Sequence, residues 1–197
     1  LDMFMNYPSS FASNFSNEFS SLSLFQGVSS DILREMMISA QSSHYQKGAV
    51  IVPQGAIVSR CYAVLDGWCG ANKVNTEGQE AILQLYRRGD VILESVSGVE
   101  ADTSPVNLVA LSPVQLLTLS TGSVRLALER SPTFLANMLA ASLRRNQDLR
   151  DHVEQLTLLS AEQRVGRFLL QLRFWENPES KDISLPFEKS LIAAYLG

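Results

Sequence analysis

Side chains of the kinds that carry out catalysis or bind metals are scarce in this sequence. It contains two cysteines, Cys61 and Cys69, and two histidines, His44 and His152. The cysteines lack Cys-x-x-Cys spacing and are too few for a four-thiolate iron–sulfur cluster or a disulfide scaffold. We interpret them as buried strand residues rather than redox sensors. We therefore expect no metal site and no iron–sulfur cluster.

The same scarcity argues against an enzyme. A cupin-type metalloenzyme needs clustered His and Glu ligands, whereas the two histidines are far apart and lack metal-ligand spacing. The sequence also contains no Ser-His-Asp or Cys-His arrangement, no P-loop and no dinucleotide fingerprint. These observations predict a protein that binds rather than catalyses.

Size and charge narrow the class further. The chain has 197 residues and a net charge of −4, which gives no global reason for nucleic-acid binding but allows a local basic element. No apolar run approaches the roughly 18 residues of a membrane-spanning helix, and the N-terminus lacks the features of a signal peptide. We expect a cytoplasmic protein of one large or two small domains, with no membrane partner.

The central part of the sequence is expected to form an antiparallel β-roll or jelly roll. Between Tyr45 and Ser120, short β-rich runs alternate with turn residues such as Asp66-Gly67, where glycine supplies a positive φ. Seven or eight short strands at this spacing are typical of such folds. The predicted strands are Ala49–Val52, Cys61–Leu65, Ala71–Val74, Ala81–Tyr86, Val91–Leu93, Val106–Leu111 and Leu116–Leu119.

Two segments precede the predicted roll. Residues 1–30 contain no Lys or Arg but nine Ser, with an aromatic repeat at Phe11, Phe15 and Phe19. We expect a weakly amphipathic leader lying on a larger body, with partial disorder as the alternative. A short helix behind the N-cap candidate Ser29 is then predicted to end near Ser42.

A long helix follows the roll. A short helix over 121–130 leads to Ser131, which caps a helix from Pro132 to Leu159. Its apolar residues recur near every seventh position, as a two-stranded coiled-coil seam requires. We expect a homodimer, with a helix packed wholly on its own roll as the alternative. The predicted seam comprises Leu135, Met138, Leu139, Ser142, Asn146, Leu149, Val153 and Leu156.

The C-terminal part is predicted to form the start of a small α/β unit. Ser160 and Gln163 have the spacing of a capping box, which predicts another helix. After a polar connection, Ile183-Ser-Leu185 is a short strand candidate. A small helix is predicted to begin at Pro186 and to end on Gly197.

This order of elements resembles the Crp/Fnr transcription regulators from about Leu24 to Gly197. The resemblance rests on motifs in the roll and in the two C-terminal helices, in matching order and spacing. These motifs are Lys47-Gly48, Gln54-Gly55, Tyr62-Ala-Val-Leu-Asp-Gly67, Glu77-Gly-Gln-Glu-Ala-Ile-Leu83, Gly89-Asp90, Arg164-Val-Gly-Arg-Phe-Leu-Leu-Gln-Leu172 and Leu185-Pro-Phe-Glu-Lys-Ser-Leu-Ile-Ala-Ala-Tyr-Leu-Gly197.

The resemblance implies an α+β fold in which a cyclic-nucleotide-binding-like roll precedes a dimerisation helix and the start of a winged helix-turn-helix domain. It divides the chain into a leader (1–23), an effector domain (24–131), a dimerisation helix (132–159) and an incomplete DNA-binding domain (160–197). The implied partners are a second copy of the chain, DNA, RNA polymerase and a small or gaseous effector.

In this family the second helix of the helix-turn-helix motif enters the major groove and contacts base edges. The sequence stops before that helix, so we expect a shortened chain rather than a natural protein that lacks the DNA-reading helix. Lys189 and Ser190 on the first helix are candidates for phosphate contacts, with a solvated surface as the equal alternative.

Cyclic-nucleotide members bind ribose through a Gly-Glu pair and the cyclic phosphate through an Arg-Ser pair. Here Leu93-Glu94 and Ser104-Pro105 stand in those places, with Glu100 and Asp102 nearby. Because an unpaired phosphate beside carboxylates is costly, cyclic AMP is disfavoured. The candidate effector pocket comprises Leu93, Glu94, Ser104, Asn107, Leu149 and Arg150.

Other branches sense gases through iron–sulfur clusters or haem, and some sense small acids. Glu77-Gly-Gln-Glu80 and Leu185-Pro-Phe-Glu-Lys189 look closest to the nitric-oxide-responsive, denitrification-type branch. Haem or nitric oxide is therefore the leading effector expected, with His152 or His44 as a candidate haem ligand and an ordinary histidine as the alternative. The alternative function is an effector-binding or scaffolding module without DNA-binding activity.

Overall fold

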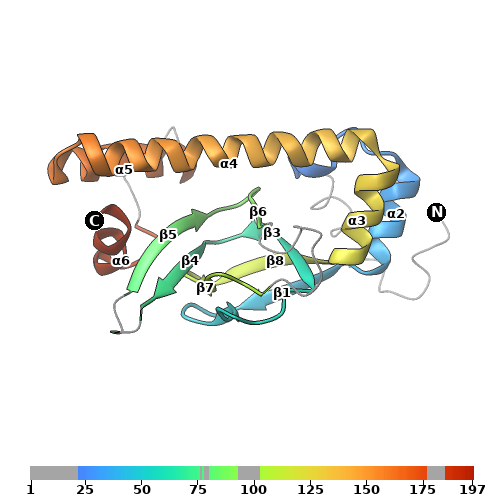
Figure 1. Cartoon of the computed structure of the whole chain (residues 1–197), viewed down its shortest axis with the longest axis horizontal. Helices are drawn as coiled ribbons and strands as arrows, with labels where there is room; N and C mark the ends of the chain where they lie inside the picture. Colours follow the sequence, from blue (N-terminus) through green and yellow to red (C-terminus); the bar gives the residue numbers. More distant parts are fainter. Residues whose placement is uncertain (1–21, 76, 78–79, 93–102, 177–184) are drawn as a thin grey trace.

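A long helix lies across a two-sheet roll and joins groups of shorter helices at its two ends (Figure 1). The computed structural model describes residues 22–75, 77, 80–92, 103–176 and 185–197. No helix within these ranges is long and apolar enough to cross a membrane. The helical elements are η2 (Ser23–Phe25), α2 (Ser30–Ile38), α3 (Thr121–Arg130), α4 (Pro132–Leu158), α5 (Ala161–Glu176) and α6 (Lys189–Leu196).

The roll consists of two four-stranded sheets, with strand orders β1-β8-β3-β6 and β2-β7-β4-β5. Every ladder between the described strands is antiparallel. This confirms the fold expected from the spacing of the β-rich runs. The strands are β1 (Gln41–Tyr45), β2 (Val50–Val52), β3 (Arg60–Asp66), β4 (Cys69–Val74), β5 (Glu80–Tyr86), β6 (Val91–Ile92), β7 (Asn107–Ala110) and β8 (Val114–Ser120).

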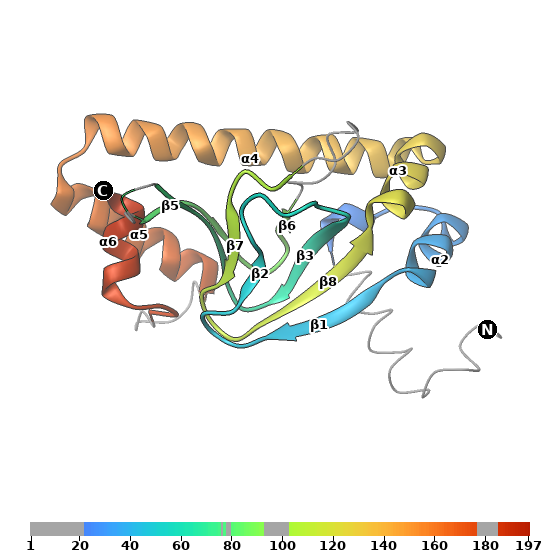
Figure 2. The same ribbon diagram turned by 60° about the horizontal axis from the view of Figure 1, so that its bottom comes forward.

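Strand β8 supplies side chains to two separate cores. Successive strand residues point to opposite faces of a sheet. Leu116 belongs to the core between the two sheets, together with Val64 and Leu108. Leu117 belongs to a second core, which includes Met36 of α2 and Phe134 of α4. The outer face of the β1-β8-β3-β6 sheet is therefore covered by the helices at one end of the roll, as Figure 2 shows.

Two of the helix starts marked in the sequence, those at Ser131 and Ser160, are made as predicted, whereas the side chain of the N-cap Ser29 makes no capping hydrogen bond. Ser131 Oγ accepts a hydrogen bond from the Phe134 N–H at 3.2 Å, and Pro132 occupies the first turn. At the start of α5 the Ser160 N–H donates to Gln163 Oε1 at 2.9 Å, and the Gln163 N–H donates to Ser160 Oγ at 3.4 Å. These reciprocal bonds form the capping box and place a sharp boundary between α4 and α5.

The turn between β3 and β4 requires glycine. Gly67 has a φ of +79°, and a Cβ there would lie 2.1 Å from the carbonyl oxygen of Pro113. Such a separation is shorter than any van der Waals contact, so every other residue would displace the chain. The predicted positive φ at the roll turns is confirmed at this position and at Gly48, Gly55 and Gly89.

Three predicted boundaries differ from the structure. The first helix ends at Ile38 rather than near Ser42, because Gln41–Tyr45 pairs with β8 as strand β1. The last helix begins at Lys189 rather than Pro186, behind the extended N-cap Glu188. Leu185 does not lie in a strand. Ile183, the aromatic repeat at Phe11, Phe15 and Phe19, and most of the predicted leader lie outside the described residues.

Candidate functional site

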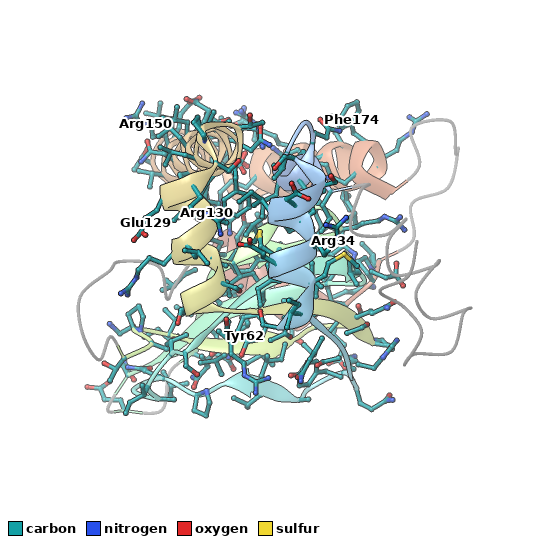
Figure 3. The ribbon with its side chains drawn as sticks, turned by 90° about the vertical axis from the view of Figure 1, so that its right-hand side faces the viewer. Arg34, Tyr62, Glu129, Arg130, Arg150 and Phe174 are labelled. Atoms are coloured by element: carbon teal, nitrogen blue, oxygen red, sulfur yellow. The ribbon has the colours of Figure 1, made fainter. Side chains whose placement is uncertain are left out.

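Helix α4 presents an apolar stripe to solvent. Its large hydrophobic residues Leu135, Leu139, Leu149, Val153 and Leu156 are all exposed. Together with exposed Ser142 and Asn146 they follow the alternating four- and three-residue steps of a heptad repeat. Figure 3 shows Arg150, beside this stripe, on the side of α4 that faces away from the roll. Seven of the eight predicted seam residues therefore share one face of α4 that the described part of the chain leaves exposed.

Met138 is the exception among the predicted seam residues. It is 7% exposed and packs in the core that contains Leu24 and Phe134. One residue corresponds to a rotation of about 100° around a helix, so Met138 and Leu139 cannot both face the same partner. Met138 belongs to a second, inward stripe of α4, which continues through Arg145 and His152 at seven-residue intervals.

Arg145 links the inward side of α4 to the roll by hydrogen bonds. Its Nη1 and Nη2 donate to the carbonyl oxygen of Leu85 in β5 at 3.2 and 3.3 Å. The guanidinium also lies 4.3 Å from the ring centre of Tyr86 and 4.0 Å from Asp148 Oδ2. This cation–π contact and the paired hydrogen bonds orient α4 on strand β5.

Further along α4, His152 and nearby groups form a polar centre. The His152 ring stacks on Tyr195 of α6 with centroids 4.2 Å apart. Burial lowers the pKa of His152 and raises the pKa of Tyr195 to about 12. Burial also raises the pKa of Asp90, whose Oδ2 accepts a hydrogen bond from the Arg87 N–H at 2.9 Å. Burial thus shifts each of these pKa values in the direction that favours the neutral form.

Helices α5 and α6 pack on the outer face of strands β4 and β5. Nine buried residues form the contact, which we call the α5–α6 cluster: Trp68, Ile82, Leu85, Leu111, Phe168, Leu172, Phe187, Ile192 and Leu196. Phe187, just before α6, meets Trp68 edge to face at 5.5 Å. The two C-terminal helices are thus held directly against the roll.

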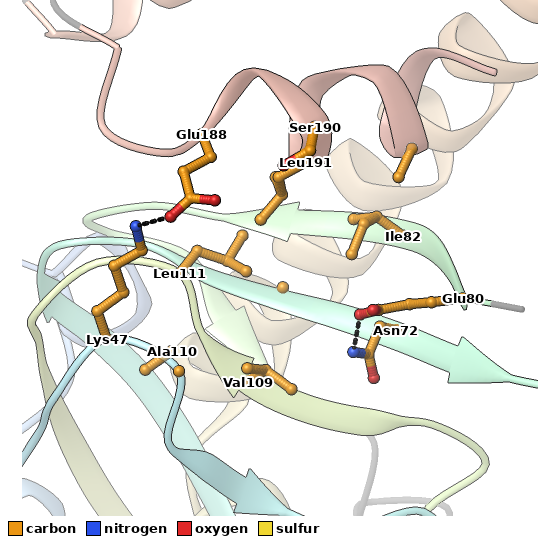
Figure 4. Close-up of a pocket in the computed structure, with 13 residues that line it drawn as sticks. Lys47, Asn72, Glu80, Ile82, Val109, Ala110, Leu111, Glu188, Ser190 and Leu191 are labelled. Carbon is orange, nitrogen blue, oxygen red and sulfur yellow. Dashed lines mark hydrogen bonds and ion pairs between the residues drawn. The ribbon is translucent and has the colours of Figure 1, made fainter. Parts of the chain in front are cut away.

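An open groove of about 300 Å³ runs along the edge of this contact. Figure 4 shows Lys47 Nζ donating across it to Glu188 Oε1 at 2.8 Å, and Asn72 Nδ2 donating to Glu80. Both members of the Lys47–Glu188 pair are largely exposed, so the pair is worth little in stability. It does place the start of α6 above the β-sheet.

The predicted effector residues do not gather in one described cavity. Ser104 is buried in the roll, where its Oγ donates to the Val106 carbonyl at 2.6 Å, and the space beside it measures about 10 Å³. Asn107 Oδ1 accepts from the Gln54 N–H at 2.8 Å. Leu149 and Arg150 line a different, open groove on α4. Leu93 and Glu94 lie outside the described residues, so the pocket stays a prediction.

Within the described residues, neither histidine lies beside a space of haem size. His44 is exposed on β1, and His152 lines a cavity of about 80 Å³, against about 300 Å³ or more for a typical cofactor pocket. No group of three His, Cys, Asp or Glu within the described ranges could hold a metal ion. Both cysteines are buried thiols, and burial raises the pKa of the Cys69 thiol to about 12.

The proposed phosphate contacts are accessible. Lys189 and Ser190 are exposed in the first turn of α6. Ser190 also lines the groove beside the Lys47–Glu188 pair. These positions are compatible with a phosphate contact and equally with a solvated surface.

Sequence reasoning missed the polar stripe on the inner side of α4. Arg145, Asp148, His152 and Gln155 recur at three- and four-residue steps, which is a helical period that could have been found. The apolar stripe one residue away concealed it. Arg87 and Tyr195, which meet these residues, lie far away in the sequence and could not be connected to them by spacing.

Comparison with known proteins gives concordant matches. Residues 42–131 match the family model of the cyclic nucleotide-binding domain. The nitrogen fixation regulation protein FixK from Bradyrhizobium diazoefficiens is 25% identical over 168 residues, which cover 84% of this chain and 69% of FixK. The structure of FixK2 from Bradyrhizobium japonicum has a TM-score of 0.68 at 21% identity, covering 80% of this chain and 77% of FixK2.

Two further structures share the fold. The c-di-GMP-responsive global regulator CLP from Xanthomonas campestris has a TM-score of 0.68 at 18% identity and covers 85% of this chain and 84% of its own. The sensor domain of the transcriptional regulator DNR from Pseudomonas aeruginosa has a TM-score of 0.59 at 24% identity, covering 77% of this chain and 99% of its own.

Proposed function

We propose that the chain is an effector-responsive, homodimeric transcription regulator of the Crp/Fnr type, in which residues 42–131, the part that matches the cyclic nucleotide-binding domain, form the effector domain. The names of FixK, CLP and DNR support the regulatory role.

The apolar stripe of α4 carries the proposal of a dimer. Five large apolar side chains are exposed along one face of a 27-residue helix. Exposing such a stripe to water is unfavourable, and a parallel copy of the same helix buries it by knobs-into-holes packing. Asn146 lies on the stripe and would fix the register of the two helices.

DNA binding is proposed for the C-terminal helices. Helix α6 corresponds in order to the first helix of a helix-turn-helix, which crosses the phosphate backbone. The break between α4 and α5 at Leu159 and Ser160 is the natural hinge. An effector that favours one orientation of α5 and α6 over another would shift the dimer toward its DNA-competent state.

The effector is proposed to bind the roll, and cyclic AMP is not the expected ligand. The space of about 10 Å³ beside Ser104 suffices for one water molecule. Ser104 carries no charge, and its hydroxyl donates to the Val106 carbonyl, so that proton is not available to a cyclic phosphate. The resemblance suggests haem or nitric oxide as the effector, and a titration tests this proposal.

The dimer is tested by light scattering after size-exclusion chromatography. The wild-type chain is expected to have twice the mass of one chain, and Leu149→Asp is expected to be a monomer because it places a charge in the seam. Leu158→Asp is the matched control, since Leu158 is exposed on α4 outside the heptad positions. A Leu149→Asp dimer would overturn the assignment of the stripe.

DNA binding is tested with the complete gene product, by fluorescence anisotropy on duplex DNA at low salt. Binding that weakens with salt and with Lys189→Ala supports the proposed role of α6. Failure to bind any duplex DNA would favour the alternative, an effector-binding or scaffolding module.

Effector classes are tested by titrating the wild-type chain with cyclic AMP and hemin. We expect no saturable cyclic AMP binding. A hemin-dependent Soret band that disappears in His152→Ala or His44→Ala would establish that residue as an axial ligand. The absence of a Soret band would exclude haem as the effector and would leave a small molecule bound in the roll as the proposed effector.

A further inference from the structure

An open hollow of about 540 Å³ lies where the end of α5 meets two turns of the roll, and we call it the roll–α5 hollow. Helix α5 contributes Trp175 to its lining. Leu22, the first residue that the structure describes, also lines the hollow. The chain that precedes Leu22 therefore joins the described structure at this hollow. The lining residues from the roll are Asp66, Gly67, Trp68, Arg87, Arg88 and Gly89.

Leu22 anchors the chain at the hollow. It is 3% exposed and packs in the core that contains Leu24 and Phe25. Its carbonyl oxygen accepts a hydrogen bond from the Phe25 N–H at 3.0 Å. Four residues of any conformation span at most about 14 Å. The backbone of residues 18–21 therefore stays within that distance of the buried Leu22.

The hollow offers a positive charge to a ligand. Its two guanidinium groups, from Arg87 and Arg88, face one carboxylate among the lining residues, that of Asp66, so the lining has a net charge of +1. Arg87 lies over Trp175, with its guanidinium 5.0 Å from the ring centre. Arg88 is exposed and forms no ion pair with a described residue. Arg88 is therefore the cation that is available to an acidic group.

The sequence before Leu22 has the complementary composition. Residues 1–21 contain no Lys or Arg, and Glu18 is the only charged residue among residues 3–21. Glu18 comes four positions before Leu22 and is followed directly by Phe19, the last aromatic residue of the repeat. The chain thus carries one negative charge and an adjacent apolar ring close to the point where it is anchored.

We propose that residues 18–21 bind in the roll–α5 hollow, where the carboxylate of Glu18 pairs with Arg88 and the ring of Phe19 packs against Trp175. An arginine binds a carboxylate through two parallel hydrogen bonds. A single exposed ion pair contributes little stability, but Leu22 tethers the segment beside its site. The contact is therefore intramolecular, and a short tether corresponds to a millimolar effective concentration.

The contact holds α5 against the roll. Trp175 lies on α5, whereas Arg88 belongs to the roll. Trp68 and Trp175 meet across the same boundary with ring centres 5.9 Å apart. A segment that binds only the assembled arrangement stabilises it, so residues 18–21 act as a strap between the roll and the C-terminal helices. Binding needs neither DNA, effector nor a second copy, and its failure leaves the proposed regulatory function unaffected.

Limited proteolysis of the full chain with chymotrypsin tests the proposal, with the cleavage rate after Phe19 measured by mass spectrometry. A segment bound in the hollow is protected, so Arg88→Glu should raise this rate at least fivefold over the wild type. Arg125→Glu is the matched control, because Arg125 is exposed on α3 outside the hollow, and it should be cleaved as slowly as the wild type. Cleavage after Phe11 serves as the internal reference in each protein.

A charge exchange identifies Glu18 as the partner of Arg88. Glu18→Lys should also be cleaved rapidly after Phe19, and the double variant Glu18→Lys/Arg88→Glu should be cleaved at least fivefold more slowly than Glu18→Lys. Each comparison joins two proteins with the same residues around the cleaved bond, so the preference of the protease cancels.

Three outcomes would overturn the proposal: equal cleavage of the wild type and Arg88→Glu after Phe19, equally fast cleavage of Arg125→Glu, or a double variant that is cleaved as fast as Glu18→Lys. Protection that grows with protein concentration would also overturn it and would assign the hollow to a second copy. Circular dichroism first checks that each variant is folded. If Arg88→Glu is not, Arg88→Met takes its place, because it removes the charge without reversing it.

Discussion

At the scale of single residues, Arg145 has the clearest structural consequence. Replacing it by Met keeps the length of the side chain but leaves the Leu85 carbonyl without its donors and removes the contact with Tyr86. We expect Arg145→Met to lower the free energy of unfolding by about 2 kcal/mol. Urea denaturation measures this change.

The neighbouring Arg144 supplies the control. It is exposed on α4, so Arg144→Met should change the free energy of unfolding by less than about 0.5 kcal/mol. Equal changes in the free energy of unfolding for the two substitutions would show that Arg145 does not stabilise the packing of α4 on β5.

His152 gives a pH-dependent prediction at the same scale. Burial lowers its pKa below the ordinary value of 6.5, so the unfolded chain takes up a proton at a higher pH than the folded chain. The corresponding stability is fully present above pH 6.5 and is lost as the pH falls through the lowered pKa. Wild-type protein should therefore lose more stability on acidification than His152→Phe, which retains a ring against Tyr195.

Urea denaturation of both proteins at several pH values from 8 to 5 measures the difference. The comparison with His152→Phe removes the contribution of the carboxylates, which are common to the two proteins. Parallel pH profiles would contradict the proposed burial of His152 in its neutral form.

At the scale of elements, α5 contains two phenylalanines with opposite environments. Phe168 is 1% exposed in the α5–α6 cluster, whereas Phe174 is 71% exposed. Figure 3 shows Phe174 on the outer side of α5. Phe168→Ala should lower the free energy of unfolding by about 3 to 5 kcal/mol, because it leaves a cavity between the helices and the roll.

Phe174→Ala is the matched control, and its effect should stay below about 0.5 kcal/mol. The fluorescence of Trp68 and Trp175, which lie 5.9 Å apart at this contact, follows the separation of α5 from the roll. Similar losses for the two variants would contradict the packing of α5 on strands β4 and β5.

At the scale of the whole molecule, Asn146 is expected to limit the affinity of the dimer. An amide in a coiled-coil seam fixes register at a cost in stability. Asn146→Leu should therefore lower the dimer dissociation constant about tenfold, equivalent to about 1.4 kcal/mol. Sedimentation equilibrium measures it, with Gln147→Leu one residue away as the control. An unchanged or higher dissociation constant would place Asn146 outside the seam.

Much of the architecture follows from local sequence signals. The starts of α4 and α5 could be predicted because their capping hydrogen bonds depend only on nearby residues. These residues are Ser131, followed by Pro132, and the Ser160–Gln163 pair. Gly67 marks its turn because a Cβ would collide with the adjacent chain. The heptad spacing of α4 likewise revealed an apolar stripe, since a helix projects every third or fourth residue to one side.

The roll, the order of the helices and the apolar stripe of α4 could therefore be predicted from local sequence patterns alone. That Gln41–Tyr45 is a strand became evident from the folded chain, because this polar segment pairs with β8, which lies far away in the sequence. Only the tertiary structure decided that Met138 turns inward and that Arg87, Gln155 and Tyr195 share one cavity. Long-range packing brings such residues together, and no periodicity within one segment encodes it.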